Sequence, residues 1–139
     1  MKTKYVCGFL FDMAFKHVAL INKVRPDWQK GKLNGIGGKV EPRESLDAAM
    51  AREFEEEAGR HFSASTWKMF AEIEGSDWVV YFFFNVSDAV FLLESKTDEK
   101  VEVIEVDTLN NNDRVIQNLK WLIPMTMDKH HLSCKAESR

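Results

Sequence analysis

The sequence predicts an α/β protein of one domain, in which a mixed β-sheet carries helices on both faces. The chain has 139 residues, the usual length of a single domain, and a domain of that size buries about two thirds of its unfolded surface. Strand-like apolar runs come first, then an amphipathic helical segment, then further strands and a second helical segment. Placing the helices on both sides of one sheet is the simplest way for elements in this order to bury their apolar faces.

The N-terminal segment predicts a β-hairpin followed by a polar loop. Two apolar runs, Tyr5–Phe11 and Val18–Val24, flank the turn segment Asp12–Lys16, which is the arrangement of two paired strands. Residues 25–33 are mostly polar and contain a proline and a glycine, so we expect them to form a loop.

Residues 45–58 predict one amphipathic helix. Ser45 suits the N-cap, and Gly59 suits the position just beyond the last turn. Apolar side chains recur at steps of three and four residues and would share one buried face; they are Leu46, Ala49, Met50 and Phe54.

Three more strands are predicted in the second half of the chain. They are Trp67–Ile73, Trp78–Val86 and Val101–Val106. Trp78–Val86 is apolar almost throughout, so we expect it to lie centrally and to be covered on both faces. Glutamates alternate with apolar residues in Val101–Val106, which is typical of an edge or half-exposed strand.

The C-terminal segment predicts a helix and a tail. Val115–Met127 is helix-like, and Pro124 within it indicates a kink or a new turn. Residues 129–139 are predicted to form a loose tail. The histidine pair His130 and His131 lies in that tail and is expected to be solvated.

A cluster of carboxylates lies on the predicted helix 45–58. Glu53, Glu56 and Glu57 are three and four residues apart, so their side chains converge on one patch. Like charges at this spacing oppose helix formation by a few tenths of a kcal/mol per pair, and a divalent cation would remove that penalty. Mg²⁺ prefers oxygen ligands and is commonly held by carboxylates together with substrate phosphates. The alternative interpretation is a solvated acidic face balanced by Arg52 and Arg60.

These carboxylates belong to a longer pattern with fixed spacing, G-x5-E-x7-R-E-U-x-E-E-x-G, where U is a bulky apolar residue. The matching residues are Gly38, Glu44, Arg52, Glu53, Phe54, Glu56, Glu57 and Gly59. The seven identities other than Phe54 would match by chance at one start point about once in 10⁸. The pattern resembles the Nudix box over Gly38–Arg60, although Arg60 stands where that family usually has an apolar residue.

The resemblance implies a Nudix-type α/β/α sandwich and an enzyme that uses Mg²⁺, with Mn²⁺ as an alternative ion. It implies that Glu53, Glu56, Glu57 and the carbonyl of Gly37 ligate the metal. Arg52 would hold Glu53 in place, and Glu44 would be a supporting ligand or would orient the others. The general base is expected to be either Glu53 or a glutamate from a later loop, for which Glu99 is the favoured candidate.

The resemblance also implies a small-molecule nucleotide as substrate. Nudix enzymes hydrolyse a nucleoside diphosphate linked to another group. The loop Asn34–Val40 is similar to that of the MutT-like branch, which removes oxidised purine triphosphates. We therefore expect a (d)NTP, oxidised or not, to be cleaved to the monophosphate and pyrophosphate. ADP-ribose, a nucleotide sugar, a dinucleotide polyphosphate or a capped RNA end is the alternative substrate.

Five residues outside the box are candidates for binding that substrate: Lys23, Asn34, Lys39, Asn118 and Trp121. The two lysines would contact phosphate, and Asn34 would hydrogen-bond a base edge. Asn118 and Trp121 lie in a segment similar to the helix that closes the base pocket, where a tryptophan can stack on a base. Solvated lysines, a turn asparagine and a core tryptophan are the structural alternatives. Trp28 is a further stacking candidate.

Composition excludes some classes of function. The net charge of −3 is not that of a general nucleic-acid binder. Neither a signal peptide nor a membrane-length apolar run is present. Cys7 lies in an apolar run and is expected to be a core thiol, and Cys134 lies in the polar tail. We expect a cytoplasmic enzyme, monomeric or homodimeric. A non-catalytic nucleotide-binding module is the less favoured class, because all the box carboxylates are present.

Overall fold

The computed structural model describes residues 1–137 of the chain, with the side chains of residues 1–130. The strands are β1 (Thr3–Phe11), β2 (His17–Asn22), β3 (Leu33–Asn34), β4 (Ile36–Lys39), β5 (Lys68–Glu74), β6 (Trp78–Val86) and β7 (Val101–Glu105). The α-helices are α1 (Leu46–Ala58) and α2 (Leu119–Glu137). Four short 3-10 helices join them: η1 (Asp27–Gln29), η2 (Ala64–Thr66), η3 (Asp88–Leu92) and η4 (Val106–Asn111).

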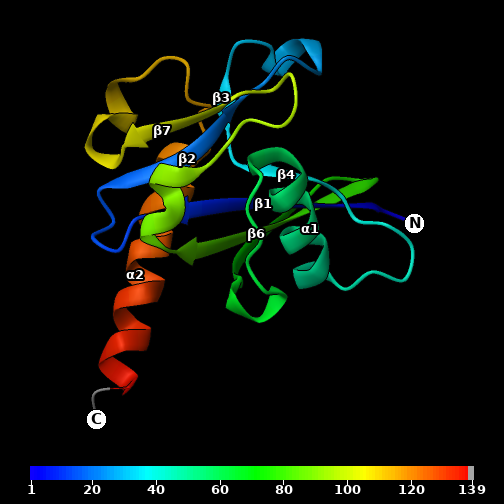
Figure 1. The fold of residues 1–139 in the computed structure, drawn as a ribbon. Helices are drawn as coiled ribbons and strands as arrows, with labels where there is room; N and C mark the ends of the chain where they lie inside the picture. Colours follow the sequence, from blue (N-terminus) through cyan, green and yellow to red (C-terminus); the bar gives the residue numbers. More distant parts are fainter. Residues whose placement is uncertain (138–139) are drawn as a thin grey trace.

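The strands form one seven-stranded mixed sheet in the order β3-β2-β1-β6-β5, and β4 and β7 pair with β1 and β2 respectively. Strands β1 and β6 run parallel over their whole length, from Thr3 opposite Trp78 to Phe11 opposite Val86. The other pairings are antiparallel. The α/β class and the mixed sheet predicted from the sequence are therefore confirmed (Figure 1).

Strand β1 divides the core into two layers, because successive side chains point to opposite faces of a sheet. Cys7, Phe9 and Phe11 contribute to the cluster that α2 covers with Leu119, Leu122 and Ile123. Val6 and Leu10 contribute to the cluster that α1 covers with Ala49, Met50 and Phe54. The two helices thus pack on opposite faces of the sheet, as predicted.

Helix α1 begins and ends where the sequence predicted. The Ser45 side chain accepts a hydrogen bond from the Ala48 N–H, which satisfies one of the free donors of the first turn. Gly59 lies beyond the last turn in the left-handed conformation, with φ of 73°, which glycine adopts without strain. Within α1, five residues are buried: Ala49, Met50, Ala51, Phe54 and Ala58.

The glycine-rich segment was predicted as a loop, and the structure shows two short strands there. Strand β4 pairs antiparallel with β1, with Gly37 opposite Cys7 and Gly38 opposite Val6. A glycine run has low strand propensity, so the local sequence favoured a loop. Close contact with β1 overrides that preference.

The C-terminal prediction needs three corrections. Helix α2 begins at Leu119, later than the predicted Val115, because Val115 instead forms an isolated parallel bridge with Leu33. The helix then continues to Glu137, where we predicted a loose tail from residue 129, and residues 138–139 lie outside the described part of the chain. His130 is not solvated as predicted, because its ring packs 4.8 Å from that of Phe15. The side chains of His131 and Cys134 lie outside the described residues.

Candidate active site

Two glycines of β4 allow this strand to lie close to its neighbours β1 and α1. A Cβ atom on Gly37 would come within 1.9 Å of the Val6 carbonyl oxygen on β1. A Cβ atom on Gly38 would come within 2.5 Å of the Glu53 carboxyl group on α1. The first glycine therefore lets β4 pair tightly with β1, and the second makes room for the carboxylate that the box pattern predicts to be functional.

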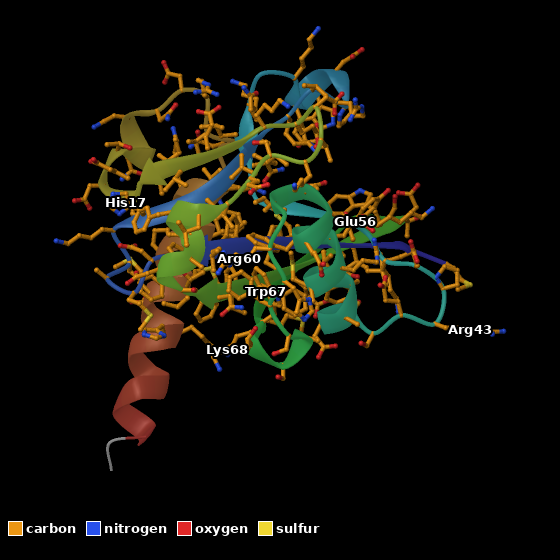
Figure 2. All side chains as sticks on the ribbon, viewed as in Figure 1. His17, Arg43, Glu56, Arg60, Trp67 and Lys68 are labelled. Carbon is orange, nitrogen blue, oxygen red and sulfur yellow. The ribbon has the colours of Figure 1, made fainter. Side chains whose placement is uncertain are left out.

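The three carboxylates of α1 differ in their surroundings. Glu56 is exposed, with 57% of its side-chain surface accessible, and Figure 2 shows it on the outer side of the helix. Burial raises the pKa of Glu53 above its ordinary value, although the neighbouring Arg52 opposes that shift. Burial, followed by the negative charge of Glu53, raises the pKa of Glu57 to about 7. Glu57 forms no side-chain hydrogen bond with any residue that the structure describes.

Arg52 connects the carboxylates of this segment. Its Nε and Nη2 atoms donate to the two oxygens of Glu44, at 2.6 and 2.8 Å, so the pair is bidentate. Its Nη1 atom donates to Glu53 at 2.9 Å and more weakly to Glu56 at 3.4 Å. Its Nη2 atom also donates to the carbonyl oxygen of Lys39 at 3.1 Å. The hydrogen bonds from Arg52 hold the pKa of Glu44 below its ordinary value.

Glu99 holds the segment that follows β2. Its carboxylate accepts hydrogen bonds from Lys23 Nζ at 3.0 Å, from the Val24 N–H at 2.8 Å and from the Arg25 N–H at 3.3 Å. Burial acts to raise the pKa of Glu99, but the hydrogen bonds from Val24 and Lys23 outweigh it and keep that pKa below its ordinary value. Glu99 also lies close enough to Glu57 for its charge to raise the pKa of Glu57.

A cleft of about 670 Å³ lies on the α2 face of the sheet. This volume is within the range of about 300–1,000 Å³ that is usual for small-molecule sites. Its lining comes from β1, the β2–β3 connection, β4, the β5–β6 hairpin and the segment before α2. A more open depression of about 540 Å³ lies beside α1 and includes Arg52, Glu56 and His61. The first cleft combines an apolar floor with polar groups, as substrate pockets usually do.

Five of the binding residues that the sequence predicts line the cleft: Lys23, Trp28, Asn34, Gly37 and Asn118. The Oδ1 atom of Asn118 is buried without a hydrogen-bond partner among the described residues. Asn34 Oδ1 accepts from the Gly35 N–H at 2.8 Å, and its Nδ2 donates to Gln29 at 3.0 Å. A buried polar atom without a partner costs roughly 1–3 kcal/mol, so the Asn118 amide indicates a place for a ligand with a complementary group.

Two of the residues predicted to bind substrate lie outside the lining of the cleft. Trp121 is 51% exposed, so it is not a core residue. Its backbone N–H donates to the carbonyl oxygen of Asn118 at 3.3 Å, but its own side chain is not among those lining the cleft. The Lys39 side chain is exposed at the end of β4 and also lies outside the lining. Trp28 does line the cleft.

The structure also adds residues that the sequence analysis missed. Tyr5 and Trp78 line the cleft and are partly exposed. The strand alternation carried the signal, because Tyr5 lies two residues from Cys7 and Trp78 lies four residues from Phe82 on the same face. The sequence could not show how far α2 covers that face of the sheet.

Within the described residues, no three acidic, histidine or cysteine side chains are already gathered in a metal-binding arrangement. Glu53 and Glu56 instead interact with Arg52. In the described part of the chain, no helix combines the length and apolarity needed to cross a membrane.

Comparison with known proteins identifies related sequences and folds. A family model described as NUDIX domain matches residues 1–124. No curated protein sequence matches the chain significantly. Many solved structures share the fold. The three described below share it at low sequence identity.

A MutT from work on Aliivibrio salmonicida and Vibrio cholerae superposes with a TM-score of 0.76 at 22% identity, over 93% of this chain and 99% of that chain. A MutT NUDIX hydrolase from Burkholderia pseudomallei gives a TM-score of 0.72 at 17% identity, over 90% and 98%. A NUDIX family hydrolase from Clostridium perfringens gives 0.68 at 16% identity, over 94% and 96%. At these identities the neighbours establish the fold.

Proposed function

We propose a function on the premise that this chain belongs to the Nudix hydrolase family, which the family match over residues 1–124 shows. We propose that the protein is a Mg²⁺-dependent pyrophosphohydrolase of a (d)NTP, oxidised or not. Water attacks a phosphorus atom of the polyphosphate, a new P–O bond forms, and a P–O–P bridge breaks. The products are the nucleoside monophosphate and pyrophosphate.

The observation that carries this proposal is the burial of the Glu57 carboxyl group among other charged side chains. Burial and the negative charges of Glu53 and Glu99 raise the pKa of this half-buried carboxyl group to about 7 against the opposing charge of Lys23, and it has no hydrogen-bond donor among the described residues. Such a cluster is unfavourable without a cation. Its donor set of carboxylate oxygens fits Mg²⁺, for which Mn²⁺ is a substitute. Glu53, Glu56 and Glu57, with the Gly37 carbonyl, would hold the ion.

When bound, Mg²⁺ supplies charge neutralisation on the phosphate oxygens and lowers the pKa of water. The protein's own residues then position the reactants. Arg52 fixes Glu53 and Glu44 through the hydrogen bonds described above, which restricts the rotamers of both carboxylates. Lys23 Nζ lies in the cleft and would contact a phosphate. Lys39 would reach a more distal phosphate from the edge of β4.

Two carboxylates remain candidates for accepting the proton of the attacking water. Glu99 already accepts three hydrogen bonds, and those would have to be given up before it could act as a base. The Oε1 atom of Glu53 accepts from Arg52, which leaves Oε2 for the proton. We therefore favour Glu53 as the general base and assign Glu99 to holding Lys23 and the segment after it.

The cleft supports a nucleotide rather than a simple polyphosphate. Asn34 and Asn118 offer amide groups to the edge of a base, and the Asn118 Oδ1 atom would gain the hydrogen bond that it lacks. The same features would serve ADP-ribose, a nucleotide sugar or a dinucleotide polyphosphate, which remain the alternative substrates. We further propose a single catalytic domain that acts in the cytoplasm, where nucleotides and Mg²⁺ are available.

The test is a substrate panel with the purified full chain and Mg²⁺. Phosphate release would be measured with coupled pyrophosphatase across canonical and oxidised (d)NTPs, and a phosphatase would detect monoester products from ADP-ribose, nucleotide sugars and dinucleotide polyphosphates. Preference for one (d)NTP with pyrophosphate as product would support the proposal. Turnover of none of the panel, together with tight nucleotide binding, would overturn it in favour of a binding module.

A further inference from the structure

The floor of the cleft is built from rows of side chains that cross the sheet. Strand pairing places Gly37, Cys7, Phe82 and Ala71 in one row, from β4 across β1 and β6 to β5. The next row on the same face consists of Lys39, Tyr5, Val80 and Ile73. Thr3 and Trp78 form the third row. Rows two residues apart along a strand share a face, so the floor is continuous.

Burial decreases along this floor. In the first row, Cys7 and Phe82 are buried in the core that α2 covers. In the outer rows, Tyr5 is 37% exposed and Trp78 is 39% exposed, and both line the cleft. Asn118, just before α2, also lines the cleft. The open apolar part of the floor, which we call the outer floor, consists of Tyr5, Ile73, Val80 and Trp78.

The indole ring of Trp78 is held in place although it is exposed. A Cβ atom on Gly75 would come within 2.4 Å of the Trp78 ring atoms, so the ring lies directly against the backbone of the β5–β6 turn. The hairpin hydrogen bond from the Gly75 N–H to the Trp78 carbonyl, at 2.9 Å, fixes the same turn. A rigid aromatic surface that is partly open to a cleft favours stacking with a planar group.

Charge separates the outer floor from the place where phosphates would bind. Among the described residues that line the cleft, Lys23 carries the one positive charge and Asp77, beside Trp78, the one negative charge. Lys39 lies at the β4 end of the second row, near the carboxylates of α1. Once Mg²⁺ neutralises the carboxylates of α1, as proposed above, Lys23 and Lys39 favour anionic groups at the β4 end, and an uncharged group is favoured over Tyr5, Val80 and Trp78.

We propose that the outer floor is a subsite for an additional uncharged planar group attached to the base of the nucleotide substrate, with Trp78 as its stacking residue. This inference rests on the proposed function, because it assumes that phosphates lie at the β4 end and that the base lies near Asn34 and Asn118. A base in that position covers the first row and leaves the outer floor free. The protein would then prefer nucleotides with enlarged bases over unmodified ones.

The test compares ATP with N6-benzyl-ATP, which carries a planar apolar ring on the exocyclic amine. For the full-length protein with Mg²⁺, we expect kcat/KM to be about tenfold higher for N6-benzyl-ATP, in keeping with the usual strength of ring stacking on an aromatic side chain. Trp78→Leu keeps an apolar cover on the floor but should remove most of that preference, and Trp78→Phe should restore it in part. Trp121→Leu is the matched control, because that tryptophan is exposed outside the cleft.

A binding measurement separates the subsite from the proposed reaction. Affinities for N6-benzyl-AMP and AMP would be compared by calorimetry, where turnover is not needed. If neither triphosphate is hydrolysed but the Trp78-dependent preference for N6-benzyl-AMP is present, the subsite is supported and the proposed function fails. If ATP is hydrolysed but the benzyl group gives no preference, or if Trp78→Leu and Trp121→Leu have equal effects, the subsite is overturned and the proposed function stands.

Discussion

Replacing Glu57 by glutamine should stabilise the metal-free protein at neutral and alkaline pH. The pKa of Glu57 is raised from 4.5 to about 7 by burial and by Glu53, and each unit of pKa shift corresponds to about 1.4 kcal/mol. A folded-state pKa above the unfolded value gives a contribution that is fully present below about pH 4.5 and is lost as pH rises through about 7. Because Glu57 is partly exposed, we expect a gain of about 1–3 kcal/mol for Glu57→Gln at pH 8.

Equilibrium urea unfolding in EDTA at pH 8 and at pH 4.5 would measure this effect. The stability difference between Glu57→Gln and the native chain should be largest at pH 8 and close to zero at pH 4.5. Glu56→Gln is the matched control, since the exposed Glu56 side chain should change stability by less than about 0.5 kcal/mol. Equal stability of Glu57→Gln and the native chain at pH 8, or a loss in the variant, would refute the view that burial and the charge of Glu53 destabilise ionised Glu57.

Three further predictions concern the site and its support. Glu56→Gln should lower kcat by several orders of magnitude while the unfolding midpoint stays nearly unchanged; near-normal turnover would contradict its assignment as a metal ligand. Gly38→Ala should lower kcat/KM by about 100-fold with the far-UV spectrum retained, because its Cβ would displace the Glu53 carboxylate. Asp12→Ala should destabilise the protein by about 2 kcal/mol in urea unfolding. The reason is that the buried Asp12 Oδ1 atom accepts hydrogen bonds from the Lys16 and His17 N–H groups, both at 2.8 Å. An unchanged unfolding midpoint would show that water replaces both hydrogen bonds.

The sequence could predict α1 almost to the residue because local signals agree there. The Ser45 cap, the apolar spacing through Phe54 and the Gly59 stop all indicate the same helix, and the structure confirms each. The contacts of Arg52 with Glu53 and Glu56 were predictable for the same reason, since a helix fixes which side chains meet. Strand β6 was also predicted with its observed bounds, because both of its faces are apolar.

The remaining differences arise where tertiary contacts decide. Strand β4 forms because its glycines fit against β1, which no local propensity indicates. Helix α2 extends past the prediction, and His130 contacts Phe15 across a sequence separation that the sequence pattern cannot show. Trp121 and Trp78 are both exposed tryptophans in apolar segments, and only the position of α2 places Trp78 in the cleft and Trp121 outside it.

The pairing of β4 with β1 explains how one substrate could reach both halves of the site. Gly38 is opposite Val6, whose side chain belongs to the core beneath α1, and Gly38 accordingly lies against Glu53. Gly37 is opposite Cys7, whose side chain belongs to the core beneath α2, and Gly37 accordingly lines the cleft. Adjacent residues of a strand face opposite sides, and β4 pairs only with β1 among the described strands. A nucleotide with its base in the cleft would therefore bring its phosphates to the α1 carboxylates by crossing the unpaired edge of β4. Gly37 and Gly38 have no side chains that would block this path.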